Sequence, residues 1–88
     1  MLGKQTVMTS GIAEAIKQPG FYKEIMECLD KFTSHDWGNL CDEDKESNDY
    51  ALTHEERIVA KYDTTQGNIY IITEWDRSVT TILFTDEY

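Results

Sequence analysis

The last quarter of the chain, residues 69–84, limits the possible folds more than any other segment. It is rich in β-branched and aromatic residues and is interrupted by one short polar segment, Asp76, Arg77 and Ser78. Such residues favour strands, and a short polar segment between two of them is typical of a hairpin turn. The sequence therefore predicts two strands, 69–75 and 79–84, which together supply half of a sheet.

A third strand is predicted directly upstream. Residues 57–62 alternate in character, and one face carries Ile58, Ala60 and Tyr62. A loop over residues 63–68 contains a glycine suited to a positive φ, so the three strands should form an antiparallel meander. Residues 5–9 are short and β-prone, which makes them a candidate fourth strand at the sheet edge.

Two main helices are expected before the strands. Along residues 21–32, apolar side chains at helical spacing form one stripe, made of Phe21, Ile25, Cys28, Leu29 and Phe32. A second helix is predicted over residues 42–52, with Cys41 or Asp42 at its N-cap. A brief helical turn over residues 12–17 precedes both. The expected fold is α+β: one domain over residues 1–88, with two main helices packed on the sheet.

The charge balance limits the class of partner. Seventeen carboxylates face eight Lys and Arg, which gives a net charge of −9 and a pI near 4.4. This field repels nucleic acid and anionic membranes and attracts basic surfaces. We therefore expect no direct binding of nucleic acid or membrane. The charge either keeps the chain soluble or docks it on a basic partner.

The expected partner-binding residues lie mainly on the second helix. They are Asp42, Glu43, Asp44, Glu46 and Asp49, together with Trp37 and Arg77. The acidic run lacks the glycine and oxygen spacing of a calcium loop. A solvated, well-capped helix would explain it without any partner. Carboxylates along a helix can also imitate the spacing of phosphates, because the helix rises about 5.4 Å per turn, so nucleic-acid mimicry is the alternative interpretation.

His35 and Asp36 are the candidates for chemistry, since a histidine beside a carboxylate can act as a base or bind a metal. Adjacent side chains usually point apart, however, and no nucleophile follows at a diagnostic spacing. We therefore expect a helix stop here, with Trp37 on the core, and no catalytic residue, metal or cofactor. A small catalytic or metal-dependent module around His35, Asp36 and Asp76 is kept as the alternative.

The two arginines of the chain, Arg57 and Arg77, should each have a carboxylate partner near the sheet. A two-pronged contact of Arg77 with Glu74 or Asp76 would fix the geometry of the hairpin. A structural role is favoured over ligand binding.

Cys28 and Cys41 show no metal-binding spacing with the two histidines. No signal peptide, membrane-spanning run or lipidation sequence is visible. The expected location is the cytoplasm, with both thiols reduced.

Seven short strings are spread over about two-thirds of the chain: 35–38, 44–45, 48–49, 51–52, 71–78, 80–83 and 87–88. Together they resemble one family of small proteins, the "plasmid-related" proteins of conjugative elements, plasmids and phages. The string Trp75-Asp76-Arg77-Ser78-Val79-Thr80-Thr81 is the most specific of them. Many members carry Gly-Asp-Trp-Gly where this chain has His35, and most have no assigned activity. The resemblance implies a mobile-element accessory protein and transfers no catalytic residue.

The leading functional hypothesis is thus a non-enzymatic protein that inhibits a nucleic-acid-handling host protein, such as a CRISPR nuclease, through its carboxylates. The rivals are the catalytic module described above and a structural accessory whose acidity is incidental.

Overall fold

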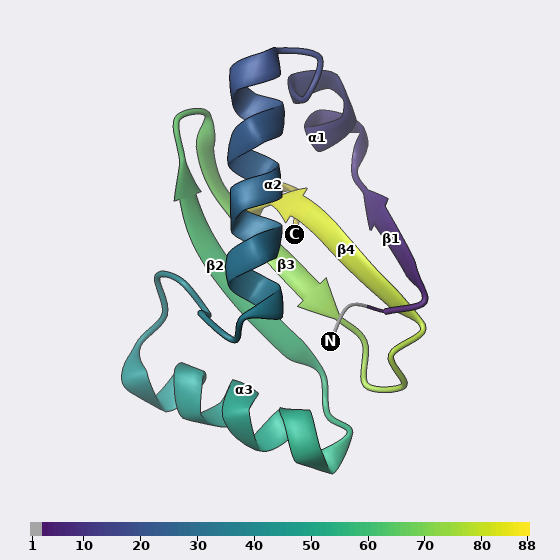
Figure 1. Cartoon of the computed structure of the whole chain (residues 1–88), viewed down its shortest axis with the longest axis vertical. Coiled ribbons are helices and arrows are strands. Elements are labelled where there is room, and N and C mark those ends of the chain that lie inside the picture. The colour runs from purple at the N-terminus through teal and green to yellow at the C-terminus, as the bar shows by residue number, and fades with distance from the viewer. Residues whose placement is uncertain (1–2) are drawn as a thin grey trace.

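The computed structural model describes residues 3–88, which form one small α+β domain (Figure 1). In chain order, the elements are β1 (Gln5–Met8), α1 (Ser10–Ala15), α2 (Pro19–Thr33), α3 (Asp42–His54), β2 (Ile58–Thr64), β3 (Gly67–Thr73), β4 (Val79–Phe84) and a 3₁₀ turn, η1 (Thr85–Glu87). The predicted fold class is confirmed.

The four strands form one mixed sheet in the order β1-β4-β3-β2. Strands β2, β3 and β4 are the predicted antiparallel meander. The candidate fourth strand is present and lies parallel to β4, with Val7 opposite Thr81. Parallel pairing requires a long crossover, and here everything from α1 to β3 lies between the two strands.

One face of the sheet packs against α2, which runs across it in Figure 1. The stripe on α2 contributes Phe21, Ile25, Cys28 and Phe32, and the sheet contributes a matching set: Ile58, Ala60, Tyr62, Ile69, Ile71 and Ile82. Leu29 is only half-buried at the margin of this core. The stripe is therefore centred closer to Cys28 than its spacing alone suggests.

Several predicted boundaries shift. The first short helix spans Ser10–Ala15 and is capped by Thr9, because the Thr9 hydroxyl accepts from the Ile12 amide. Helix α2 begins at Pro19, since proline lacks the amide hydrogen that a first helical turn leaves free. Helix α3 continues to His54.

The strands also differ from the prediction at their ends. Strands β2 and β3 extend to Thr64 and Gly67, so the loop between them is shorter than expected. Strand β3 ends at Thr73, and Trp75 lies in the following turn, where 61% of it is exposed.

The segment after α2 closes part of the outer edge of β2. The Asn39 amide donates to the Lys61 carbonyl, and the Lys61 amide donates to the Trp37 carbonyl. Gly38 lies between these contacts with φ +76°, and a Cβ there would collide with the Lys61 carbonyl. Gly38 thus adopts the left-handed conformation that glycine tolerates, and the close backbone approach explains why no side chain fits.

Candidate protein-binding surface

The acidic surface is defined here as Asp42, Glu43, Asp44, Glu46 and Asp49, and all five side chains are exposed. They lie on α3, which crosses one end of the sheet in Figure 1. Within residues 3–88, no Lys or Arg forms an ion pair with any of them. Their charge is therefore not neutralised by an ion pair within the described residues.

The polar character of α3 explains why so much of it faces water. Its buried residues are Asn48 and Ala51, with Leu52 half-buried beside them. Asp42, Glu43 and Asp44 occupy its first turn, where the helix dipole is positive. Cys41 is the N-cap residue and makes no side-chain cap hydrogen bond.

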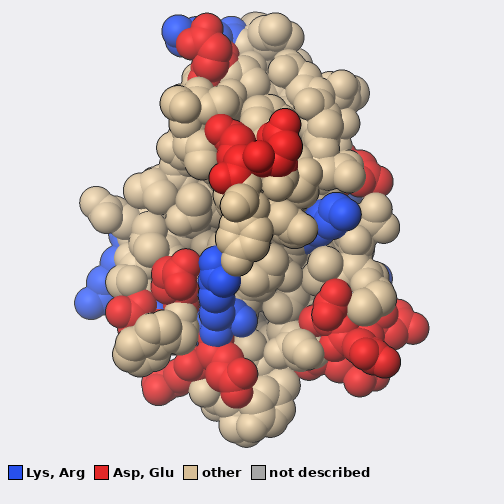
Figure 2. Space-filling model, turned by 180° about the vertical axis from the view of Figure 1, so that it is seen from behind, with Lys and Arg blue, Asp and Glu red and all other residues tan. Residues whose placement is uncertain are grey.

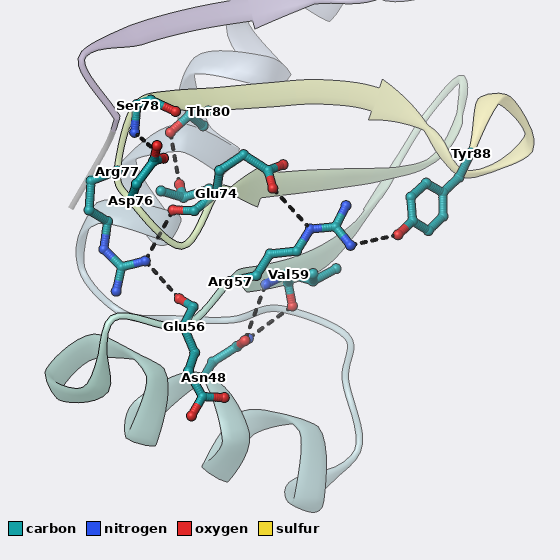
Figure 3. A network of polar contacts seen from close by, with 11 residues as sticks. Asn48, Glu56, Arg57, Val59, Glu74, Asp76, Arg77, Ser78, Thr80 and Tyr88 are labelled. Carbon is teal, nitrogen blue, oxygen red and sulfur yellow. Dashed lines mark hydrogen bonds and ion pairs between the residues drawn. The ribbon is translucent and has the colours of Figure 1, made fainter.

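Asn48 attaches α3 to the sheet. Its amide nitrogen donates to the Val59 carbonyl at 2.9 Å, and the Val59 amide donates to the Asn48 Oδ1 at 3.2 Å (Figure 3). An asparagine amide carries both a donor and an acceptor, so it can replace a neighbouring strand at that residue. Asn48 is 4% exposed, which makes this a buried anchor.

Trp37 is a second anchor rather than a contact surface, which corrects its expected role in partner binding. Only 3% of it is exposed, and its ring packs edge-on against Phe32 with centroids 5.6 Å apart. Its indole N–H donates to the Asp49 Oδ1 at 2.9 Å. The alternative expectation, that Trp37 lies on the core, is the one the structure shows.

Arg77 holds the other end of α3, and the predicted contact with a carboxylate is wrong. Its guanidinium donates to three backbone carbonyls instead. Two are those of Glu56 at 2.7 Å and Glu74 at 3.3 Å (Figure 3), and the third is that of Ala51 at 2.7 Å. Ala51 lies in the last turn of α3, where its carbonyl also accepts from the amides of Glu55 and Glu56. A cation at this end of the helix complements the dipole. Arg77 thus links the β3–β4 turn to the C-terminal end of α3, and these contacts leave it half-buried. These contacts give Arg77 a structural role, and its part in partner binding stays a prediction.

Arg57 is the arginine that pairs with a carboxylate. Its Nε lies 3.6 Å from Glu74 Oε1, and its Nη1 donates to the Tyr88 hydroxyl at 2.9 Å (Figure 3). The guanidinium also lies 5.6 Å from the centre of the Tyr88 ring, and Tyr88 packs edge-on against Tyr70. These contacts hold the last residue of the chain over the sheet.

The candidate catalytic module gains no support from the geometry. Asp36 accepts from the Gly38 amide, and Asp76 accepts from the Ser78 amide, so each carboxylate stabilises its own turn. His35 has φ +64° and stacks on Trp37. In the part of the chain that the structure describes, no three His, Cys, Asp or Glu side chains are grouped as a metal site.

The sheet face opposite α2 is a feature that the sequence analysis did not single out. Its side chains lie outside the helix–sheet core and include Val7, Val59, Tyr70, Ile72 and Leu83. We call this set the open face, although Ile72 and Leu83 are only 3% and 6% exposed and Val7 is its one exposed member. Figure 2 shows this side of the molecule, where uncharged side chains cover much of the surface and carboxylates gather in separate groups around them. The sequence did carry a signal for this face. In strands β2 to β4, the residues between the core positions are also largely apolar, which is typical of a sheet that is covered on both faces.

A groove of about 560 Å³ lies between the open face and α3. Val59 and Tyr70 line it from the sheet, Leu40 and Asp44 from the helix side, and Tyr88 from the C-terminus. The groove therefore joins the acidic surface to the aromatic part of the open face.

Three carboxyls, of which Asp76 and Glu87 are exposed and Glu24 is half-buried, have a pKa below its ordinary value because each accepts hydrogen bonds. Thr65 lowers the pKa of Glu24, the side chain and backbone of Ser78 lower the pKa of Asp76, and Thr9 lowers that of Glu87. All three bonds hold turns or chain ends in place. The cause of each shift is therefore a contact that stabilises the fold.

Burial has the opposite effect on two core groups. It raises the pKa of the Cys28 thiol and that of the Tyr62 hydroxyl, which donates to the Asp36 carbonyl at 2.7 Å. Both groups are therefore neutral at physiological pH.

Comparison with known proteins adds no assignment: the chain matches no protein-family model, no curated protein and no solved structure. None of the helices within residues 3–88 is long and apolar enough to cross a membrane.

Proposed function

We propose that this protein is a non-enzymatic accessory of a mobile genetic element, which binds and inhibits a basic, nucleic-acid-handling protein in the cytoplasm of the host. A CRISPR nuclease is the kind of target we propose. The resemblance to plasmid-related proteins supports the mobile-element origin. The net charge of −9 supports a basic partner.

One observation carries the proposal. Five exposed carboxylates project from a single helix, and polar anchors hold that helix at two places. Asn48 attaches it to Val59, and Arg77 binds the Ala51 carbonyl in its last turn. A charged surface on a fixed element loses little conformational entropy when it binds, which favours affinity.

The charge distribution also fits the proposed mode of inhibition. A nucleic-acid channel is positively charged because it neutralises phosphates. Carboxylates on successive turns of α3 are about 5.4 Å apart along the axis, a spacing comparable to that of phosphates along one strand. A helix that occupies such a channel excludes the nucleic acid by competition.

The groove beside α3 would supply the second part of the interface. Tyrosine is enriched among the residues that contribute most to binding, and Tyr70 and Tyr88 line this groove together with Asp44. Tyr88 is 68% exposed, so its ring is available to a partner. In this arrangement the acidic surface accelerates encounter, and the tyrosines slow dissociation.

Affinity capture followed by an activity assay tests the proposal. The immobilised protein is exposed to host lysate at low and at high salt, and captured basic proteins are identified. The purified target is then assayed for cleavage of its nucleic acid with and without this protein. The proposal predicts salt-sensitive capture and competitive inhibition. A captured partner whose nucleic-acid binding and cleavage stay unchanged would contradict it.

A further inference from the structure

Strand β1 presents an unpaired edge of the sheet. The Gln5 amide donates to the Ser78 carbonyl and the Thr9 amide to the Ile82 carbonyl, so from Gln5 onward the odd-numbered residues direct their backbone groups toward β4. Just before the strand, the Lys4 amide also donates inward, to the Arg77 carbonyl. In a parallel ladder, alternate residues bond to the same neighbour. The amides and carbonyls of Thr6 and Met8 therefore point away from the sheet, and within residues 3–88 no residue bonds to them.

The opposite edge of the sheet is already covered. On β2, the Asn48 side chain bonds to Val59, and the backbone of residues 37–39 bonds to Lys61. An unpaired edge is a template for another strand, and proteins usually block such edges. Here the block is present on β2 and absent from β1, whose residues are all exposed.

The charge pattern indicates what could pair with this edge. Residues 3–13 contain no carboxylate, although the whole chain carries seventeen, and Lys4 is their one charged side chain. Two copies of a chain with net charge −9 repel one another over most of their surfaces. The β1 segment adds no negative charge of its own to a contact between two copies. The nearest carboxylate at the C-terminal end of β1 is that of Glu87, which accepts a hydrogen bond from the Thr9 hydroxyl.

The geometry of the edge also complements itself. If two copies of β1 pair antiparallel with Thr6 opposite Met8, all the outward amides and carbonyls of these residues form bonds across the pair. Val7 then faces Val7 of the other copy at the twofold axis. In other antiparallel registers, either Thr6 faces Thr6 of the other copy or Met8 faces Met8. Such a register uses only half of the outward amides and carbonyls.

This register continues the open face across the pair. Val7, Thr81, Ile72 and Val59 are neighbours in one row across the four strands. Val7 ends that row with 39% of it exposed. Contact between the two valines would cover the exposed end of the row, and such cross-strand apolar pairs stabilise sheets.

We propose that β1 binds β1 of a second copy of this chain in this register and forms a continuous eight-stranded sheet. Because the shared strand is only four residues long, the dimer dissociates on dilution. Salt strengthens it, since screening weakens the repulsion between two acidic copies.

Sedimentation velocity on the full chain, from micromolar to millimolar concentration at low and high salt, tests the proposal. The dimer fraction should rise with concentration and with salt. Met8→Pro should abolish the dimer and leave the fold intact, because it removes an outward amide that bonds to nothing within the monomer. Met8→Leu keeps that amide and should dimerise like the parent.

Val7→Lys provides a second variant, because it places like charges at the twofold axis and should also give a monomer. Amide exchange at Thr6 and Met8 should slow as the protein concentration rises. A parent chain that is monomeric at every concentration, or a folded Met8→Pro variant that dimerises like the parent, would overturn the proposal. Salt should strengthen this dimer, whereas it should weaken binding of the acidic surface to a basic partner. Failure of one proposal is therefore distinguishable from failure of the other.

Discussion

The anchor between Asn48 and Val59 gives the sharpest stability prediction. Asn48→Ala removes two hydrogen bonds and leaves the amide and carbonyl of Val59 without their partners. A typical hydrogen bond contributes about 1 kcal/mol net, and an unsatisfied buried group costs about 1–3 kcal/mol. Val59 is half-buried, so water can replace part of what is lost. We expect the free energy of unfolding to fall by about 2 kcal/mol.

The assay is thermal and urea denaturation with Asn39→Ala as the matched control. Asn39 also donates through its side-chain amide, but its partner is the exposed carboxylate of Asp63. For a domain of this size, about 2 kcal/mol corresponds to roughly 8–16 °C in Tm, whereas the control should change stability by less than about 0.5 kcal/mol. Amide exchange at Val59 should accelerate in Asn48→Ala. If the two variants lose equal stability and exchange at Val59 is unchanged, the anchoring of α3 by Asn48 is refuted.

Three further predictions test the structural account. Arg77→Ala should lower the free energy of unfolding by about 2–4 kcal/mol, because it removes a charged donor from three carbonyls. In urea denaturation, Arg77→Lys should recover part of this loss. If the alanine variant is as stable as the parent, the contacts of Arg77 with these carbonyls do not stabilise the fold. Ile25→Ala should lower the free energy of unfolding by about 2–5 kcal/mol, and Leu29→Ala should lower it clearly less, since only Ile25 is fully buried. If both variants lose equal stability in denaturation, the apolar stripe of α2 is not centred where the structure has it. Glu24 and Glu87 have a lowered pKa in the folded state, so their stabilising effect is present above the ordinary pKa of 4.5 and is lost as pH falls through the folded pKa values. Glu24→Gln should therefore be less stable than the parent at neutral pH, and its stability should depend less on pH below about 4.5. A pH profile of acid denaturation identical to that of the parent would contradict this.

The meander and the α2 stripe could be predicted from the sequence because they depend on local periodicity. Residues 57–62 alternate and residues 21–32 repeat at helical spacing, so neighbouring residues alone identify the buried faces. The parallel pairing of β1 with β4 could not be predicted in this way. It joins segments more than seventy residues apart, and a four-residue strand carries too little pattern to choose its neighbour.

The site residues show the same limit. Exposure of the five carboxylates follows from their position on a polar helix, and the structure confirms it. The roles of Trp37 and Arg77 depend on which groups the fold brings to them, namely Asp49 for the indole and backbone carbonyls for the guanidinium. Backbone acceptors carry no sequence signal, so a carboxylate partner for Arg77 was the natural but wrong expectation.

The central claim is that the acidic surface steers the chain to a basic partner. Glu43→Gln, Asp44→Asn and Glu46→Gln together remove three charges from α3 without changing Asp49, which holds Trp37. The matched control removes three exposed carboxylates elsewhere: Glu27→Gln, Asp30→Asn and Asp86→Asn. Both triple variants have the same net charge, so they separate the position of the charge from its amount.

The most direct test is the association rate with the captured partner, measured by stopped-flow or surface binding over a range of ionic strength. The account predicts that the α3 variant associates more slowly than the parent and that its rate depends less on salt, whereas the control stays close to the parent. If the α3 variant and the control associate at the same rate at every ionic strength, the acidic surface is only a solvated face of the helix.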